Sequence, residues 1–475
     1  MRHLYPLALL LAIIISSCQP NEKEKNNSVN GIWESIGSGW VLQIQDSAAY
    51  SLYDITSISC LPNRIGAFEE IQEVLKIKND TLSLLKGVMT YNFVRQNTLP
   101  EVCLSTPEAA KQDDPLYNFE VFAETVREHY AFFKLNNLRW DELYEQQKDR
   151  LAKDPTDVKL YLTIEEILEK LNDNHAYLEA TEDVYEAVDS SSEDSSETND
   201  EQLPEYGDFQ VAQMVAKHHM QEEMTEDSWL IQWGKLNETT GYIQLKAMWL
   251  YADLDIPKAL IEKQGYVDAY VTTFHQMYEG AYIEKEVFGV RKIMDKVMED
   301  LSQTTSMVID VRFNGGGQDA VNFEILRRFN PERRKVVMTR LKHGKKFSPL
   351  QSLFLEASPK AYTNPVYVLT SQQTGSAAEA LAIGAISLPH FTIIGSNTQG
   401  ALSTALEKSL PNGWAFSISN EIYMDKDGNS YENVGVPPDY RLNYPEDRQD
   451  FFRSVVNNLE KDKADILEAI EALDK

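Results

Sequence analysis

The sequence predicts an α/β protein in which a small antiparallel β domain and a helical domain precede an α/β core. Short runs of alternating apolar and polar residues fill 31–104, and apolar residues recur at helical spacing over 112–180. Strand-like and helix-like segments then alternate over 229–445, which is typical of a sheet with crossover helices. A C-terminal helical segment, 446–475, follows as one amphipathic helix or two short ones.

The composition bounds the function without selecting it. The chain has 475 residues, enough for roughly two to four domains. Its formal net charge of -29 argues against nucleic acid and anionic lipid surfaces as partners, because both would repel it. These properties predict neither a substrate nor an oligomeric state.

The first 30 residues have the organisation of an exported lipoprotein. Residues 1–17 combine a basic start with an apolar run too short to span a bilayer comfortably, which predicts a signal peptide. The run ends in two serines and Cys18, a pattern that resembles a bacterial lipobox, and residues 18–30 form a polar tether. We therefore expect a location in the bacterial cell envelope, with the membrane reached only through a lipid on Cys18. The alternative is a plain secretory signal with a chance cysteine.

The β domain is predicted from three alternating runs. These are 40–45, 75–78 and 81–85, and the last two are separated by Asn79-Asp80, a hairpin turn signal. Two cysteines, Cys60 and Cys103, belong to this region. In an exported chain they would suit a disulfide, and they would equally suit two buried thiols.

The helical domain ends in a polar turn that carries a histidine. Its last helix spans 160–171 and stops at Asn172-Asp173-Asn174, directly before His175. A lone histidine is more often a surface or capping residue than a catalyst. Residues 181–228 are expected to form an acidic insertion loop, since 189–201 is low-complexity and acidic. That stretch lacks the ligand spacing of a calcium loop.

Two predicted strands of the core end in residues suited to chemistry. The strand 306–312 runs into Asn314 and three glycines, which allow close approach to a ligand and present free N–H groups. The strand 366–369 leads through Gly375 and Ser376 to a helix that begins at Ala377. Ser376 is therefore either an exposed nucleophile or an ordinary helix N-cap. The other core strands are predicted at 241–245, 335–339, 391–395, 414–419 and 421–424.

No pattern in the chain predicts a metal or a cofactor. There is no CxxC motif or Cys/His cluster with zinc-ligand spacing. The glycine turn at 314–317 lacks the lysine and serine of a P-loop and the spacing of a dinucleotide fingerprint.

Four segments in the same order closely resemble the core of the S41 serine peptidases, the tail-specific or C-terminal processing proteases and their tricorn-type relatives. They are Ile309–Gly317, Leu369–Glu379, the short histidine motif Leu171–Leu178, and Tyr431–Asp439. The resemblance spans roughly residues 110 to 445. It implies a crotonase/ClpP-like fold built from ββα units, and it implies peptide or protein substrates.

The resemblance also assigns roles. In the processing-protease branch a lysine is the base, but its position here is Ala401, and Lys408 stands too far along to align. The tricorn-like branch uses serine, histidine and an acid, and Ser376, His175 and Glu432 match those positions. The implied mechanism has Ser376 as nucleophile, His175 as general base and Glu432 as the orienting acid. The amides of Ala377 and of Gly315 or Gly316 would form the oxyanion hole.

The sequence departs from the family pattern at two points. Asn174 stands where the tricorn-like pattern has a serine that helps link the acid to the histidine; an asparagine can still donate and accept hydrogen bonds there. The interval before Trp229 contains no carboxylate-binding loop of a PDZ domain. Two other functions are open: a non-catalytic ligand- or peptide-binding protein with the same core, and an esterase or amidase acting on small molecules.

Overall fold

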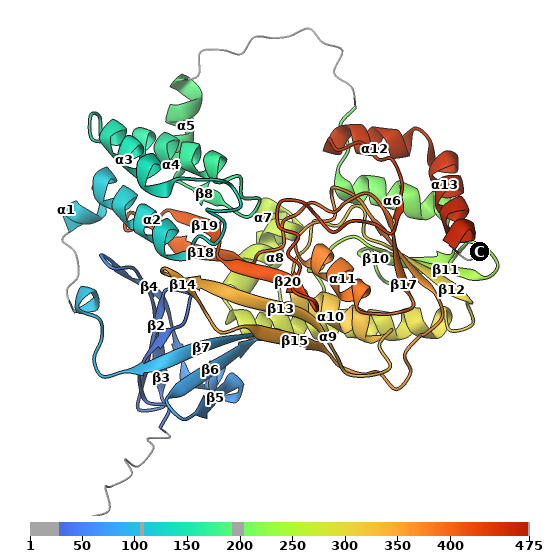
Figure 1. Cartoon of the computed structure of the whole chain (residues 1–475), viewed down its shortest axis with the longest axis horizontal. Coiled ribbons are helices and arrows are strands. Elements are labelled where there is room, and N and C mark those ends of the chain that lie inside the picture. The colour runs from blue at the N-terminus through green and yellow to red at the C-terminus, as the bar shows by residue number, and fades with distance from the viewer. Residues whose placement is uncertain (1–27, 105–108, 192–203, 474–475) are drawn as a thin grey trace, which may run out of the picture.

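The computed structural model describes residues 28–104, 109–191 and 204–473. The predicted signal peptide and Cys18 lie outside these residues, as does most of the acidic low-complexity stretch. In Figure 1 the N-terminal sheet and the helical domain lie at one end of the molecule and the α/β core at the other. None of the helices within the described ranges combines the length and apolar character needed to cross a membrane.

The N-terminal domain is a seven-stranded antiparallel sheet with the strand order β4-β3-β2-β1-β7-β6-β5. The predicted hairpin is present: Asn79 has a φ of 58°, and Lys78 pairs with Thr81 across the turn. Cys60 and Cys103 form a disulfide, so the first of the two alternatives holds. The strands are β1 (Gly31–Ser35), β2 (Trp40–Gln45), β3 (Ala49–Ile55), β4 (Cys60–Ala67), β5 (Leu75–Lys78), β6 (Thr81–Lys86) and β7 (Met89–Gln96).

The helical domain packs its helices around one apolar cluster, and three strand residues follow them. Asp114 and Thr156 cap the second and fourth helices by accepting backbone N–H groups. Asn172, in the left-handed conformation, ends the fourth helix where the polar run predicts. The elements are α1 (Ala109–Gln112), α2 (Pro115–His129), α3 (Trp140–Leu151), α4 (Asp157–Leu171) and β8 (Tyr177–Glu179).

The segment 181–228 differs from the predicted insertion loop. It contains α5 (Glu182–Ser191) and α6 (Asp208–His219), followed by the short strand β9 (Glu222–Glu223). The α6 helix forms because its apolar residues fall on one face, and that face is completely buried. The acidic composition of the neighbouring stretch hid this short apolar pattern. The buried apolar residues of α6 are Val211, Ala212, Val215 and Ala216.

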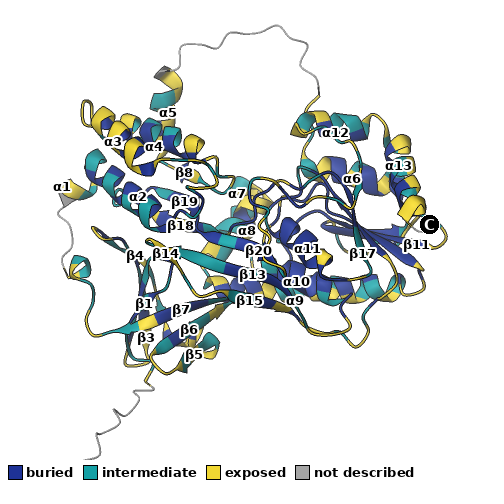
Figure 2. Cartoon of the chain, viewed as in Figure 1, coloured by how far each residue is buried: buried dark blue, intermediate teal, exposed yellow. Residues whose placement is uncertain are grey.

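The core is a seven-stranded sheet with the order β21-β17-β16-β12-β11-β10-β9. The strands β11, β12, β16, β17 and β21 are parallel, and β10 pairs antiparallel with both β11 and β9. Both faces of the central strands are covered, and Figure 2 shows these strands as buried. This explains their continuous apolar runs. They are β10 (Ile231–Lys235), β11 (Thr240–Leu245), β12 (Ser306–Asp310), β16 (Val366–Thr370), β17 (Phe391–Gly395) and β21 (Tyr440–Arg441).

Helices cover the two faces of this sheet. Tyr242, Val308 and Tyr367 pack against α13 on one face, and their neighbours Ile243 and Ile309 pack into the larger cluster on the other. The C-terminal segment forms two helices, one of the two predicted alternatives. The helices are α7 (Lys258–Gln264), α8 (Tyr266–His275), α9 (Glu279–Asp300), α10 (Asp319–Arg327), α11 (Ala377–Ile386), α12 (Arg448–Val456) and α13 (Leu459–Leu473).

Two smaller sheets complete the fold, and one of them joins the helical domain to the core. In that sheet β8 of the helical domain pairs with β19 of the core, Leu178 opposite Phe416. This pairing carries the histidine turn onto the core, and His175 lies 201 positions from Ser376 in the sequence. The strands of the two sheets are β13 (Arg334–His343), β14 (Lys346–Phe347), β15 (Gln351–Leu355) and β20 (Glu421–Asp425) in one, and β8, β18 (Ala405–Ser409) and β19 (Ala415–Ser419) in the other.

Candidate active site

Ser376 occupies a strained turn between the buried strand β16 and helix α11. Its φ of 51° and ψ of -124° lie outside the region that most residues with a side chain adopt. Such a conformation costs about 1–3 kcal/mol and persists only where the surroundings enforce it. The side chain is partly exposed and makes no capping hydrogen bond to its own helix. The residue stands at the N-cap position of α11.

Glu379 enforces this turn, and the sequence prediction gave it no role. Its fully buried carboxylate accepts hydrogen bonds from Ser376 N at 3.1 Å and from Ala401 N at 2.7 Å. It also accepts from Thr398 Oγ1 at 2.6 Å and from Gly400 N at 2.7 Å. Burial raises its pKa to about 7, against the effect of these hydrogen bonds. The spacing Ser-x-x-Glu before a helix, a known capping pattern, could have revealed this contact.

His175 meets Ser376 across the domain boundary. Its Nε2 lies 3.2 Å from Ser376 Oγ, within hydrogen-bond reach. Hydrogen bonds from β19 fix the histidine turn: Asp173 accepts from Ser419 N at 2.8 Å, and Ser417 Oγ donates to the His175 carbonyl. Within the turn, Asp173 also accepts from His175 N at 3.0 Å. The two residues that the resemblance pairs as nucleophile and base are thus adjacent.

The imidazole of His175 is held in its neutral form. Burial lowers its pKa below the ordinary 6.5, and the negative charge of Asp173 opposes that shift. A general base must be unprotonated to accept a proton, so a lowered pKa keeps it competent at neutral pH.

Glu432 does not contact the imidazole. Its buried carboxylate accepts from Leu402 N at 3.1 Å and Ser403 N at 2.9 Å, and burial raises its pKa to about 8. His175 Nδ1 has no hydrogen-bond partner among the described residues. Asn174 is exposed, and within the same ranges its side chain makes no hydrogen bond. The structure therefore places Glu432 against the loop beside Ser376. Neither Glu432 nor Asn174 forms a hydrogen bond with His175.

The glycine turn after β12 lies against the serine turn. A Cβ placed on Gly316, whose φ is 109°, would come 2.6 Å from Ser376 Cβ and 3.0 Å from Ala377 N. Gly316 N donates to Asn314 Oδ1 at 2.9 Å. Within the described ranges, Gly315 N and Ala377 N donate to no protein acceptor. The three predicted oxyanion donors are thus gathered at Ser376, with the amides of Gly315 and Ala377 available.

The structure also locates Ala401 and Lys408, the two positions at which a lysine base was considered. Ala401 is buried, and its carbonyl accepts from Ser376 N at 3.1 Å, so its side chain offers no base. Lys408 points away from the serine and pairs with Asp54 of the N-terminal sheet at 2.5 Å. Across the part of the chain that the structure describes, no group of three or more histidine, cysteine or acidic side chains could hold a metal ion.

Comparison with known proteins places this site within a family. Residues 240–442 match peptidase family S41, and this segment contains Ser376, Gly315, Gly316 and Glu432, while His175 precedes it. A candidate peptidase from Parabacteroides merdae ATCC 43184 shares the fold at 19% identity and a TM-score of 0.51, covering 73% of this chain and 96% of that one. Mature CPAF shares it at 11% identity and a TM-score of 0.52, covering 77% of this chain and 99% of that one. The segment 240–442 is therefore similar to peptidase family S41.

Proposed function

We propose that this protein is a serine peptidase that hydrolyses peptide bonds through an acyl-enzyme. The observation that carries the proposal is the 3.2 Å approach of His175 Nε2 to Ser376 Oγ, at a strained and partly exposed turn. A serine hydroxyl is a weak nucleophile until an adjacent base accepts its proton, and a neutral imidazole at this distance supplies that base.

The chemistry proceeds in two halves. Ser376 Oγ attacks the peptide carbonyl carbon as its proton passes to His175 Nε2, and a tetrahedral intermediate forms. His175 then gives the proton to the leaving amine, the C–N bond breaks, and an ester to Ser376 remains. Water, deprotonated by His175, attacks the ester and releases the acid product. The amide of Ala377, with that of Gly315 or Gly316, stabilises the negative oxygen in both halves.

Glu432 acts in this proposal as a positioning residue. Its carboxylate holds the Leu402–Ser403 backbone, one residue beyond the Ala401 carbonyl that accepts from Ser376 N. Asp173 is the carboxylate whose charge acts on the imidazole. The orientation of His175 therefore rests on Asp173 and Ser417, and that of the serine loop on Glu379 and Glu432.

Hydrolysis of a peptide library by the purified protein tests the proposal. We expect cleavage by the wild type, and loss of at least about a thousandfold in kcat/KM for Ser376→Ala and for His175→Gln, as for removal of either member of such a pair. The matched control is Ser302→Ala, which removes an exposed hydroxyl from the turn after helix α9. Cleavage by Ser376→Ala at the wild-type rate would contradict the proposal.

We also propose that the protein is exported and anchored in the cell envelope by a lipid on Cys18. The Cys60–Cys103 disulfide supports export, because disulfides persist in oxidising compartments. Membrane fractionation of Cys18→Ala tests the anchor. We expect this variant in the soluble fraction, and an unchanged membrane fraction would argue against acylation.

A further inference from the structure

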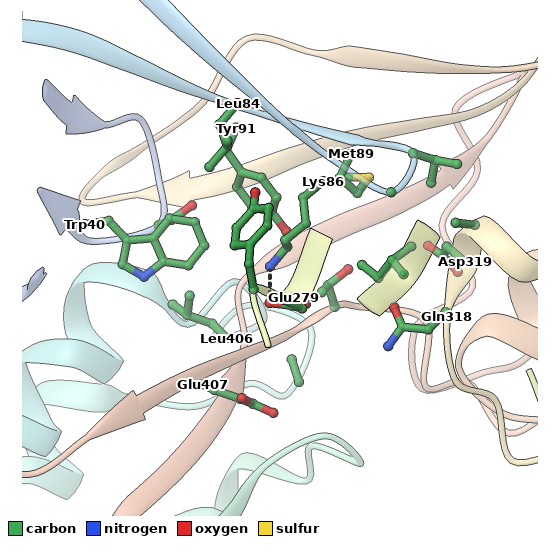
Figure 3. Close-up of a pocket in the computed structure, with 18 of the residues that line it drawn as sticks. Trp40, Leu84, Lys86, Met89, Tyr91, Glu279, Gln318, Asp319, Leu406 and Glu407 are labelled. Carbon is green, nitrogen blue, oxygen red and sulfur yellow. Dashed lines mark hydrogen bonds and ion pairs between the residues drawn. The ribbon is translucent and has the colours of Figure 1, made fainter. Parts of the chain in front are cut away.

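A cavity of about 430 Å³ lies between the N-terminal sheet and the core. Its walls come from β2, β6 and β7 on one side, and from the α8–α9 turn, the start of α10 and strand β18 on the other (Figure 3). Its volume lies in the range of small-molecule and side-chain binding pockets.

This cavity adjoins the catalytic turn through two chain segments. One wall begins at Gly317, the residue after Gly316, which touches Ser376. Another wall begins at Thr404, three residues after Ala401, whose carbonyl accepts from Ser376 N. The two walls therefore begin one to three residues along the chain from backbone groups that contact Ser376.

The cations of the cavity wall are already neutralised. Lys86 pairs with Glu279 at 2.8 Å, and the dashed line in Figure 3 marks this contact. Arg64 pairs with Glu70 at 3.1 Å. His275 is the remaining basic side chain of the wall, and it packs edge-on against Phe274.

Three carboxyl groups of the wall lack such a partner. Within the described ranges, no lysine, arginine or histidine forms an ion pair with Asp319, Glu407 or Glu421. Asp319 accepts a hydrogen bond from Tyr423 at 3.0 Å. Glu421 is 1% exposed and accepts from Thr404 Oγ1 at 2.7 Å, but its Oε1 has no hydrogen-bond partner among the residues that the structure describes. Of the three, only Glu421 is fully buried, and a buried carboxylate is costly unless a cation compensates it.

We propose that this cavity binds a lysine or arginine side chain of the peptide substrate, close to the scissile bond. Asp319 and Glu407, which come from different walls, provide the charge that selects this side chain, and Glu421 adds to it from β20. The inference rests on the proposed peptidase activity and names its substrate class: basic polypeptides. The net charge of -29 would also attract such substrates over longer distances.

The behaviour of the acids agrees with this assignment. Burial raises the pKa of Asp319 to about 6 and that of Glu421 to about 7. A bound ammonium or guanidinium group would favour the ionised forms of these carboxyl groups. The carboxyl groups would therefore become more fully ionised when a basic side chain binds.

The test compares peptides that differ at one position. A fluorogenic peptide cleaved by the wild type is varied to lysine, norleucine or glutamate at each of three positions on either side of the scissile bond. At one position we expect kcat/KM for lysine to exceed that for norleucine by about tenfold or more, and glutamate to be the poorest, since hydrogen bonds to charged groups contribute on this scale. Asp319→Asn and Glu407→Gln should each reduce the lysine-to-norleucine ratio several-fold.

Asp141→Asn is the control, because it removes one exposed carboxylate from helix α3, away from the cavity. It should leave the ratio at the wild-type value. Cleavage without a preference for lysine, or an unchanged ratio in both cavity variants, would overturn this inference alone. Failure of the wild type to cleave any peptide would overturn the proposed function, and the inference with it.

Discussion

Two glycines at the end of β12 have different tasks although they are adjacent. Gly316 has a φ of 109° and lies against Ser376, whereas an added Cβ on Gly315 would meet nothing within 4 Å. The serine turn can approach the glycine turn this closely because Gly316 lacks a side chain. At the residue scale, therefore, the nucleophile is placed by backbone packing as much as by its own hydrogen bonds.

Alanine substitutions separate these tasks. Gly316→Ala should reduce kcat/KM by about a hundredfold or more, because its Cβ would displace Ser376 from the oxyanion donors. Gly315→Ala keeps its amide and has free space, so it should stay within about threefold of the wild type. Peptide hydrolysis by the two variants is the measurement, and equal activities would contradict the assignment.

The pH dependence of kcat/KM reports on His175. Burial lowers the pKa of this imidazole below 6.5, so the base stays neutral at neutral pH. We expect activity to persist until the pH falls below this lowered pKa. Asp173 raises this pKa, so Asp173→Asn should move the acid limb to still lower pH. Glu432→Gln should move it less, since Glu432 contacts the 402–403 backbone and not the imidazole. A larger shift in Glu432→Gln than in Asp173→Asn would show that Glu432 acts directly on His175.

At the scale of elements, helix α13 is fastened to the end of strand β12. The fully buried Arg312 guanidinium pairs with Asp310 at 2.7 Å and with Asp462 of α13 at 2.8 Å. Asp462 also pairs with His219 of α6 at 2.8 Å. Arg312 directly precedes the Phe313–Gly317 turn, so this ion network supports the loop that contacts Ser376.

Removing the Asp462 carboxylate tests how much this network contributes to stability. Asp462→Asn should destabilise the protein by about 3–5 kcal/mol, because it leaves the Arg312 charge buried and less compensated. Asp465→Asn, on the exposed side of the same helix, should cost less than about 1 kcal/mol. The free energies of unfolding of the two variants are compared by urea denaturation. Similar losses of stability in both would contradict the proposed role of Asp462 in this network.

The elements also show what the sequence could predict. Strands β12, β16 and β17 were predicted because buried parallel strands are continuous apolar runs, and Gly315, Gly316 and Ser376 were found where two of them end. The strand β8, only three residues long, could not be found. Its pairing with β19 is what positions His175, so that residue was identified through a family motif. Glu432 was expected beside the imidazole of His175. Its carboxylate instead accepts hydrogen bonds from two backbone amides, and no sequence pattern predicts these contacts.

At the scale of the whole molecule, the N-terminal sheet is docked onto the core and closes the cavity beside the site. Lys408 Nζ of β18 is buried against Asp54 Oδ1 at 2.5 Å, the Ser38 carbonyl at 2.8 Å and the Gly39 carbonyl at 3.0 Å. These contacts join residues more than 350 positions apart in sequence. The pattern within each domain cannot predict them, because docking depends on the shapes of two folded surfaces.

Asp54→Asn should loosen this docking. It leaves the buried Lys408 ammonium without its counter-charge, which costs several kcal/mol. We expect faster amide hydrogen exchange in β2, β3 and β18, and slower hydrolysis of peptides because one cavity wall becomes mobile. Asp46→Asn, in an exposed turn of the same sheet, is the control. Equal exchange in the two variants would argue against a docking role for the pair.

The most direct test of the central claim is to locate a fluorophosphonate adduct by peptide mass spectrometry. If His175 activates Ser376, the wild type should carry one adduct, on the peptide containing Ser376, and His175→Gln should react at least about a hundredfold more slowly while folded. An adduct on another residue, or a folded wild type that does not react, would contradict the account.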